Sequence, residues 1–283
     1  MENSSFTVLP MSQRFSLDPG ETYTGSISIV NPADATRDFN YVMSVTPYGV
    51  MDESYTADLA TVTNRSEIVK WIKISEPSGT IKPNETKEVE FTITVPKDAA
   101  SGGQYAAITV SSNDTNNASQ GVAVNNVFEL ASLVYATVSG QTKHDGEILE
   151  NKVPGFVVKS PITLSALIKN DGNVHEDATF VISAPNVFTG EVILPTEDND
   201  GRYNELIMPE TTRQVTREIT SLPALGVIKV NQTIYYQGDV QTVEKNVIIC
   251  PIWFMCLVGV TILAIIGTII SIILKHKKKK AAI

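Results

Sequence analysis

The chain has 283 residues, a length typical of two domains or one large domain. Its composition, 42% hydrophobic and 19% charged, is that of a globular protein, which excludes a wholly disordered chain. Residues 1–246 hold 17 basic and all 31 acidic residues, and this formal charge of −14 would repel a phosphate backbone, so nucleic acid is not an expected partner.

Apolar and polar residues alternate along several segments of the N-terminal half, as they do in strands with one buried face. Residues 22–30 and 39–45 follow this pattern, and residues 89–95 follow it most closely. Polar turn groups such as Asp18-Pro19-Gly20 separate the segments. Short strands between polar turns predict an antiparallel β-sandwich. The residues of the third segment that we expect to point inward are Val89, Phe91, Ile93 and Val95.

Three further segments complete the first predicted domain. Residues 68–74 are rich in apolar side chains, and we expect them to form a strand with Trp71 packed in the core. Polar residues 111–121 predict an exposed hairpin loop, and residues 122–138 predict the strand that returns from it. Residues 140–145 are polar and are expected to form a linker to the next domain.

The second half of the sequence repeats this organisation. A strand ends in Asn31 in the first half and in Asn170 in the second, and each is followed by a polar turn and a returning strand. The asparagine side chain can bond the backbone of such a turn, which explains its position without any chemistry. In the strand that ends at Asn170, the alternating apolar residues are Ile162, Leu164, Ala166 and Ile168. Later strands are expected at 227–236 and 240–249.

The last forty residues indicate a membrane anchor. Residues 247–274 include no charged side chain, and Ile252–Leu274 alone is long enough to cross the hydrocarbon core as a helix. Trp253 and Phe254 stand at its outer end, where aromatic rings favour the membrane interface. Positive charge beside a span stays on the cytoplasmic side, so residues 1–246 are expected outside the cell. The lysines that follow the span are Lys275, Lys277, Lys278, Lys279 and Lys280.

The predicted fold class is therefore all-β, with two tandem Ig-like β-sandwich domains followed by one transmembrane α-helix. The first domain is assigned to residues 1–140 and the second to residues 141–246. Residues 247–274 are assigned to the transmembrane helix and residues 275–283 to a basic cytoplasmic tail. The expected location is a cell membrane crossed once, with the lipid bilayer as a partner.

The N-terminus and the cysteines bear on the compartment. An outward-facing chain needs an export signal, and residues 1–5 lack the features of one, so we expect that a signal peptide was removed. Cys250 and Cys256 lie in or beside the span, and the outward region has no cysteine, which favours a bacterial, Gram-positive surface over a disulfide-stapled eukaryotic one. Six Asn-x-Ser/Thr matches support the alternative, a glycosylated eukaryotic receptor.

Motifs for catalysis and metal binding are missing from the sequence. The histidines His144, His175 and His276 lie far apart, and no HExxH, CxxC, P-loop or G-x-S-x-G pattern occurs. Acidic residues 197–201 resemble a calcium loop, but the first and last carboxylates of an EF-hand are missing. We therefore expect no enzymatic activity, no cofactor and no metal site.

Aromatic residues give the better binding signal, because tyrosine and tryptophan combine a large apolar face with a polar tip. In the first domain they include Tyr48, Tyr55, Trp71, Tyr105 and Tyr135.

The candidate ligand-binding residues are Gly102, Gly103, Gln104 and Tyr105. Two glycines before a strand permit unusual backbone angles or the close approach of another chain. Ala106, Ile108 and Val110 form the expected core face of that strand, so Tyr105 is expected to face outward as a shallow platform for a sugar or a peptide. A purely structural role for the glycines is the alternative.

Six short segments of residues 1–140 match a known family in order and spacing. They are Asn31-Pro32-Ala33-Asp34, Pro47-Tyr48-Gly49, Trp71-Ile72, Gly79-Thr80-Ile81-Lys82-Pro83, Phe91-Thr92-Ile93-Thr94-Val95-Pro96 and Ala100-Ser101-Gly102-Gly103-Gln104-Tyr105. In these segments the chain resembles the first domain of the WxL-interacting proteins of Gram-positive cell surfaces.

The resemblance implies a function. In that family a peptidoglycan-binding domain is followed by a host-binding domain, a transmembrane helix and a basic tail. It implies that peptidoglycan binds to the first domain and a surface (WxL-type) or host protein to the second. The alternatives are a structural scaffold or adhesin stalk that assembles surface complexes without binding glycan and, more remotely, an envelope hydrolase.

Overall fold

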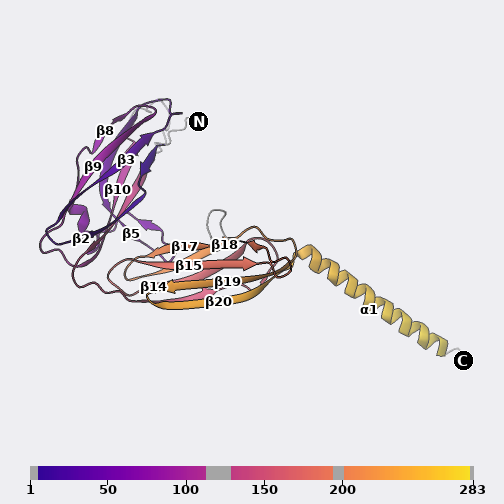
Figure 1. Cartoon of the computed structure of the whole chain (residues 1–283). Helices are drawn as coiled ribbons and strands as arrows, with labels where there is room; N and C mark the ends of the chain where they lie inside the picture. Colours follow the sequence, from indigo (N-terminus) through magenta and orange to yellow (C-terminus); the bar gives the residue numbers. More distant parts are fainter. Residues whose placement is uncertain (1–5, 113–128, 194–200, 281–283) are drawn as a thin grey trace. The chain divides into compact units, whose positions relative to one another are not determined.

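The structure is a computed structural model and describes residues 6–112, 129–193 and 201–280 (Figure 1). Strands dominate it, and one α-helix, α1 (Ile252–Lys280), follows the last strand. The chain divides into two compact units. The first comprises Met1–Gly146, Lys169–Glu176 and Leu206–Arg213, and the second comprises Glu147–Ile168, Asp177–Glu205 and Gln214–Ile283.

Two facing sheets form the sandwich of the first unit. One has the order β1-β3-β9-β7, with β1 (Thr7–Leu9), β3 (Thr22–Asn31), β9 (Glu85–Thr94) and β7 (Ile72–Ile74). The other has the order β2-β11-β10-β4-β8, with β2 (Ser12–Leu17), β11 (Glu129–Val138), β10 (Gly102–Ser112), β4 (Phe39–Pro47) and β8 (Ser78–Ile81). A small hairpin of β5 (Gly49–Val50) and β6 (Ala57–Asp58) and a 3₁₀ turn, η1 (Glu67–Lys70), complete it.

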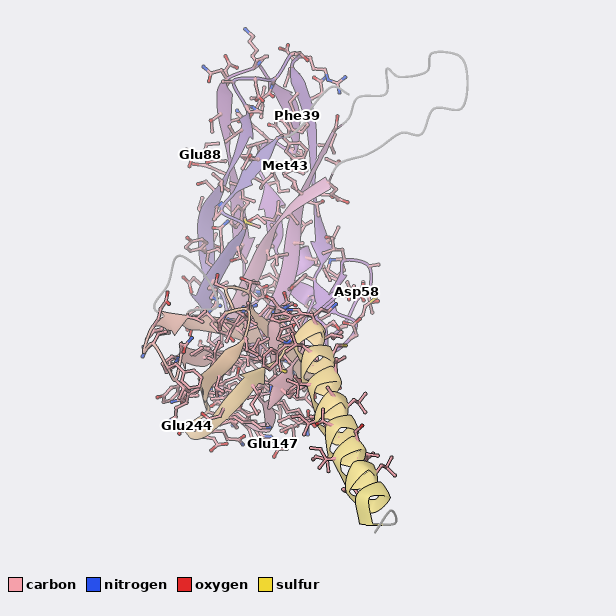
Figure 2. All side chains as sticks on the ribbon, turned by 90° about the vertical axis from the view of Figure 1, so that its right-hand side faces the viewer. Phe39, Met43, Asp58, Glu88, Glu147 and Glu244 are labelled. Atoms are coloured by element: carbon pink, nitrogen blue, oxygen red, sulfur yellow. The ribbon has the colours of Figure 1, made fainter. Side chains whose placement is uncertain are left out.

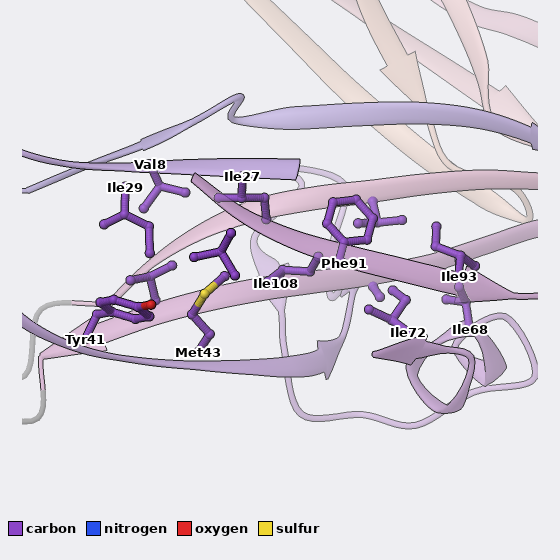
Figure 3. Close-up of a cluster of buried hydrophobic side chains, with 14 of the residues drawn as sticks. Val8, Ile27, Ile29, Tyr41, Met43, Ile68, Ile72, Phe91, Ile93 and Ile108 are labelled. Atoms are coloured by element: carbon purple, nitrogen blue, oxygen red, sulfur yellow. The ribbon is translucent and has the colours of Figure 1, made fainter. Parts of the chain in front are cut away.

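The core of this sandwich confirms the predicted alternation. Figure 3 shows Phe91 and Ile93 of β9 in the core between the two sheets, together with Ile27 of β3 and Ile108 of β10. The four residues predicted to point inward are 1%, 2%, 0% and 2% exposed, in the order Val89, Phe91, Ile93 and Val95. Figure 2 labels two further core residues, Phe39 and Met43 of β4, and an exposed residue of β9, Glu88.

The segment around Trp71 differs from the prediction. Residues 67–70 form η1, and β7 begins only at Ile72. The backbone N–H of Trp71 donates to the carbonyl of Ile68 at 2.9 Å, and this bond closes the 3₁₀ turn. The side chain of Ile68 is buried in the core. Trp71 is half-buried and packs against the core. An apolar run is compatible with either a strand or a short turn, because both can bury the same side chains.

A second pair of sheets follows. The smaller has the order β12-β14-β18, with β12 (Gly146–Lys152), β14 (Ile162–Asn170) and β18 (Thr211–Ile219). The larger has the order β13-β20-β19-β15-β16, with β13 (Phe156–Val157), β20 (Asp239–Ile249), β19 (Gly226–Tyr236), β15 (Glu176–Pro185) and β16 (Val192–Ile193). Strand β17 (Arg202–Ile207) also pairs with β15. The alternation predicted for β14 is confirmed, since Ile162, Leu164, Ala166 and Ile168 are all buried.

Both repeated asparagines have the structural role that the sequence indicates. The amide of Asn170 donates to the carbonyls of Val174 and Ile207 at 2.9 and 3.0 Å, and its oxygen accepts from the N–H of Gly172 at 2.8 Å. The amide of Asn31 donates to the carbonyls of Arg37 and Ile81 at 3.1 and 3.0 Å. These bonds satisfy buried backbone groups that would otherwise be costly.

The start of the predicted transmembrane helix needs correction. Residues 247–249 belong to strand β20, and α1 begins at Ile252. Val247 and Ile249 are buried in the sandwich core, at 0% and 3% exposure, and so they continue the alternation of the strand. Residues 111–112 form the end of β10, whereas the rest of the predicted hairpin loop, residues 122–128 and residues 197–200 lie outside the described part of the chain.

Candidate functional site

Strand β10 places Tyr105 on the face that the sequence predicts, but not at the surface. Ala106, Ile108 and Val110 belong to the core, and Tyr105 lies on the opposite face of the strand. Its side chain is nevertheless only 1% exposed. The predicted outward platform is therefore wrong, because residues from 169–176 and 206–213, which belong to the same compact unit, cover this face.

The two glycines have a structural explanation. Gly102 has a φ of +118°, and a Cβ there would lie 2.9 Å from the carbonyl oxygen of Asn173. A Cβ on Gly103 would lie 1.9 Å from the hydroxyl oxygen of Tyr105. The N–H of Gly103 donates to the carbonyl of Asn173 at 2.7 Å. The glycines thus permit a close approach of backbone and ring that no side chain would allow.

Gln104 is also buried, at 4% exposure. Its amide group donates to the carbonyl of Asn64 at 3.1 Å, and its oxygen accepts from the N–H of Ile68 at 3.4 Å. These bonds hold the loop before η1 against β10. Gly102, Gly103, Gln104 and Tyr105 therefore lie together as predicted, but their buried side chains and backbone serve packing.

Four of the tyrosines that the sequence analysis singled out pack together with one methionine. We call this group the tyrosine cluster: Tyr48, Tyr55, Tyr105, Tyr135 and Met208. Tyr105 and Tyr135 pair directly across β10 and β11 and meet edge to face with ring centroids 5.9 Å apart. The hydroxyl of Tyr105 lies 3.3 Å from Nδ1 of His175. The sequence analysis missed Met208, a member of the cluster, and His175, whose ring contacts Tyr105 and Tyr135, because both follow far along the chain.

Hydrogen bonds and charges surround the tyrosine cluster. The Tyr55 hydroxyl lies 2.6 Å from the Thr211 hydroxyl and accepts from the N–H of Met208 at 2.8 Å, and the guanidinium of Arg213 covers its ring at 4.5 Å. Arg65 forms an ion pair with Glu210 at 2.7 Å and donates to the carbonyl of Asn173 at 2.9 Å. Such an arrangement fixes the packing of buried phenols.

Burial raises the pKa of Tyr105 and of Tyr135 well above the ordinary tyrosine value near 10. Both phenols therefore stay neutral in the folded chain when the same residues ionise in the unfolded chain. Elsewhere, within the ranges that the structure describes, no three His, Cys, Asp or Glu side chains converge as metal ligands.

We expect the stability of the folded chain to fall as the pH rises above about 10. Below that pH both states bind the phenolic proton, and above it only the unfolded state releases it. Each tyrosine whose pKa is raised by folding then lowers the free energy of unfolding by about 1.4 kcal/mol per pH unit. The melting temperature should fall less steeply with pH in Tyr105→Phe than in the wild type. Equal slopes for the two chains would contradict this burial.

One aromatic residue of the first unit is exposed, among those described. Tyr23 of β3 is 36% exposed, and its ring lies 4.7 Å from that of Phe15 on β2. The sequence analysis did not single it out, because it lies within an ordinary alternating strand. An exposed ring with a polar tip suits a sugar face.

The segment predicted to cross the membrane lies in helix α1. Ile252–Leu274 is long and apolar enough to cross a membrane, and none of its residues is buried. Trp253 is 60% exposed, and its ring meets that of Phe254 edge to face at 5.7 Å in the first turn. The backbone of Lys275, Lys277, Lys278, Lys279 and Lys280 continues the helix, while their side chains lie outside the described part.

The chain matches no family model and no curated protein. Several solved structures are similar to it at low identity. The class 5 fimbriae chaperone CfaA is 11% identical over 85% of this chain and 99% of that one, with a TM-score of 0.40. The E. coli chaperone DraB is 13% identical over 85% and 96%, with a TM-score of 0.39. A PapD-like domain of human CEP192 is 18% identical over 49% and 87%, with a TM-score of 0.33.

At these TM-scores the likenesses carry no argument about this chain. Its own strands show that it is mostly β and arranged in paired sheets. The predicted all-β sandwich class is confirmed at that level, and its Ig-like assignment stays a prediction.

Proposed function

We propose that this chain is a non-enzymatic protein of a bacterial, Gram-positive cell surface, anchored in the cell membrane by one span. In this proposal the two sandwiches face outward in tandem, the first binds cell-wall peptidoglycan, and the second binds a surface (WxL-type) or host protein. The cytoplasmic tail carries the five lysines.

The observation that carries the proposal is α1. Twenty-three consecutive helical residues, Ile252–Leu274, are uncharged and strongly apolar on average, none is buried, and they follow β20 after only two residues. An uncovered apolar helix of this length is stable in a bilayer and costly in water. The lysines at its end support an outward orientation of the sandwiches.

The ligand assignment rests on the resemblance to WxL-interacting proteins. The buried positions of Asn31, Phe91, Gly103 and Tyr105 indicate that the matching segments maintain the sandwich rather than touch a ligand. A glycan would therefore contact exposed residues elsewhere on the first unit. Tyr23 is the described aromatic side chain best placed to stack on a sugar ring.

The test is sedimentation of the detergent-solubilised full-length chain with purified peptidoglycan, with cellulose as the control polymer. We expect the wild type and Tyr105→Phe to sediment equally with peptidoglycan, because Tyr105 is buried. Tyr23→Ala should bind about tenfold more weakly, the loss expected when one stacked aromatic contact is removed. Failure of the wild type to sediment above the cellulose level would reject glycan binding and favour the scaffold alternative.

A further inference from the structure

A row of exposed apolar side chains crosses one end of the larger sheet of the second unit. Five neighbouring strands, β13, β20, β19, β15 and β16, or the loops beside them, contribute to it. We call this row the apolar end patch: Phe156, Val187, Phe188, Val192, Leu225 and Ile248, which are 48%, 52%, 77%, 56%, 44% and 49% exposed.

Strand pairing brings these residues together from distant parts of the sequence. Ile248 pairs with Phe156 on one side and with Val227 on the other. The N–H of Val187 donates to the carbonyl of Val227 at 3.0 Å, and Val192 pairs with Pro185 of β15. Strands in a sheet lie about 4.8 Å apart, so the row extends across roughly 20 Å.

The most exposed member lies in a well-defined loop. The side-chain oxygen of Asn186 accepts from the N–H groups of Phe188 and Thr189 at 2.9 and 3.2 Å, and the N–H of Gly190 donates to the carbonyl of Asn186 at 2.8 Å. Phe188 is therefore presented by a hydrogen-bonded turn, so little conformational entropy is lost when its ring is covered.

The patch lies where the chain enters α1. Ile248 belongs to the patch, Ile249 ends β20, and the helix begins at Ile252. Four residues extend over at most about 14 Å, so the patch cannot lie far from the first turn of the helix. Figure 1 shows β15 ending at the same end of its sheet as the start of β19, in agreement with the bridge between Asn186 and Ile228.

The segments that form the patch also lack charge. Residues 153–158, 183–190 and 221–228 include no charged residue, as does the run from 247 to 274. Four uncharged segments thus converge at the end of the sheet next to the anchor, and Lys159 and Glu191 flank them as exposed charges of opposite sign. This pattern suits a zwitterionic lipid interface, where exposed aliphatic and aromatic tips enter and charges stay out.

We propose that the apolar end patch rests in the outer interface of the bilayer that α1 crosses, so that the second sandwich is held against the membrane and not only tethered to it. This inference rests on the proposed membrane anchoring. The bilayer is the favoured occupant because the anchor keeps the patch permanently within reach of lipid, at a far higher effective concentration than any soluble partner.

The test measures the depth of single labelled sites in the full-length chain, in which Cys250→Ala and Cys256→Ala remove the native thiols. A polarity-sensitive fluorophore is attached to Phe188→Cys or to Leu225→Cys, and the chain is reconstituted in phosphatidylcholine vesicles with nitroxide lipids. Tyr235→Cys and Val240→Cys are matched controls, because these residues are 45% and 53% exposed. They lie at the other end of the β19–β20 pair, about 26 Å along the strand from Val227.

We expect blue-shifted emission at 188 and 225, with quenching by nitroxide lipid several-fold stronger than at 235 and 240. Equal quenching at all four sites, in a chain that floats with the vesicles, would overturn the inference while leaving the anchor intact. A blue shift without lipid quenching would also overturn it, since protein would then cover the patch. A chain that does not float with the vesicles would reject the anchor and, with it, this inference.

Discussion

Replacing Leu263 with arginine is expected to release a large part of the chain from the membrane fraction. Leu263 lies at the middle of Ile252–Leu274 and is 70% exposed, so the new charge would stand at the centre of the hydrocarbon core. An arginine there costs about 3 kcal/mol by insertion scales, which corresponds to more than about a hundredfold in the insertion equilibrium.

The matched control is Ile273→Arg. Ile273 is also apolar and exposed, at 51%, but it is two residues from Lys275, where a long basic side chain reaches the interface. Alkaline extraction of membranes measures the bound fraction of both variants. Retention of Leu263→Arg as complete as that of Ile273→Arg would mean that α1 does not cross the bilayer.

Replacing Phe91 with alanine is expected to destabilise the first unit by about 3–5 kcal/mol. Phe91 is 2% exposed at the centre of the core that Figure 3 shows, and its ring meets that of Phe15 edge to face at 6.3 Å. The loss combines the apolar surface of the ring with the cavity that its removal leaves. The neighbouring Thr92→Ala is the control, because its side chain points away from this core and should change stability by less than about 0.5 kcal/mol.

Gly25 provides a second, independent check on this packing. It pairs with Phe91 across β3 and β9, and a Cβ there would lie 2.7 Å from the tip of the ring. Gly25→Ala should therefore be destabilising in the wild type but much less so when Phe91 is replaced by leucine. Chemical denaturation of the four chains gives the coupling between the two positions. Additive effects would show that the ring does not occupy the space above Gly25.

Much of the sandwich could be predicted from local sequence, because a strand with one buried face shows a period of two residues. Val89, Phe91 and Ile93 follow that period without interruption, and each is buried. Asn31 and Asn170 could also be interpreted, since an asparagine at the end of a strand can bond its own turn. These features depend on residues near one another in the sequence.

The incorrect predictions concern properties that neighbouring residues do not determine. Residues 247–249 are assigned by the sequence both to a strand at 240–249 and to the transmembrane segment at 247–274, because Val247 and Ile249 are apolar in either element, and the structure places them in the strand. Tyr105 faces away from its own core, as the alternation indicates, yet Met208 and His175 cover it from about 70 to 100 residues further along the chain. No local pattern encodes that contact.

The direct continuation of β20 into α1 has a mechanical consequence. In a chain anchored as proposed, tension between the membrane and the rest of the chain would enter the second unit at Ile249 and pull β20 along its own axis. The register with β19 runs from Gly226 opposite Ile249 to Tyr236 opposite Asp239, so the interstrand hydrogen bonds share this load in shear instead of breaking one after another. Strand β13, which pairs in parallel with the last two residues of β20, adds resistance at the point where the force is applied.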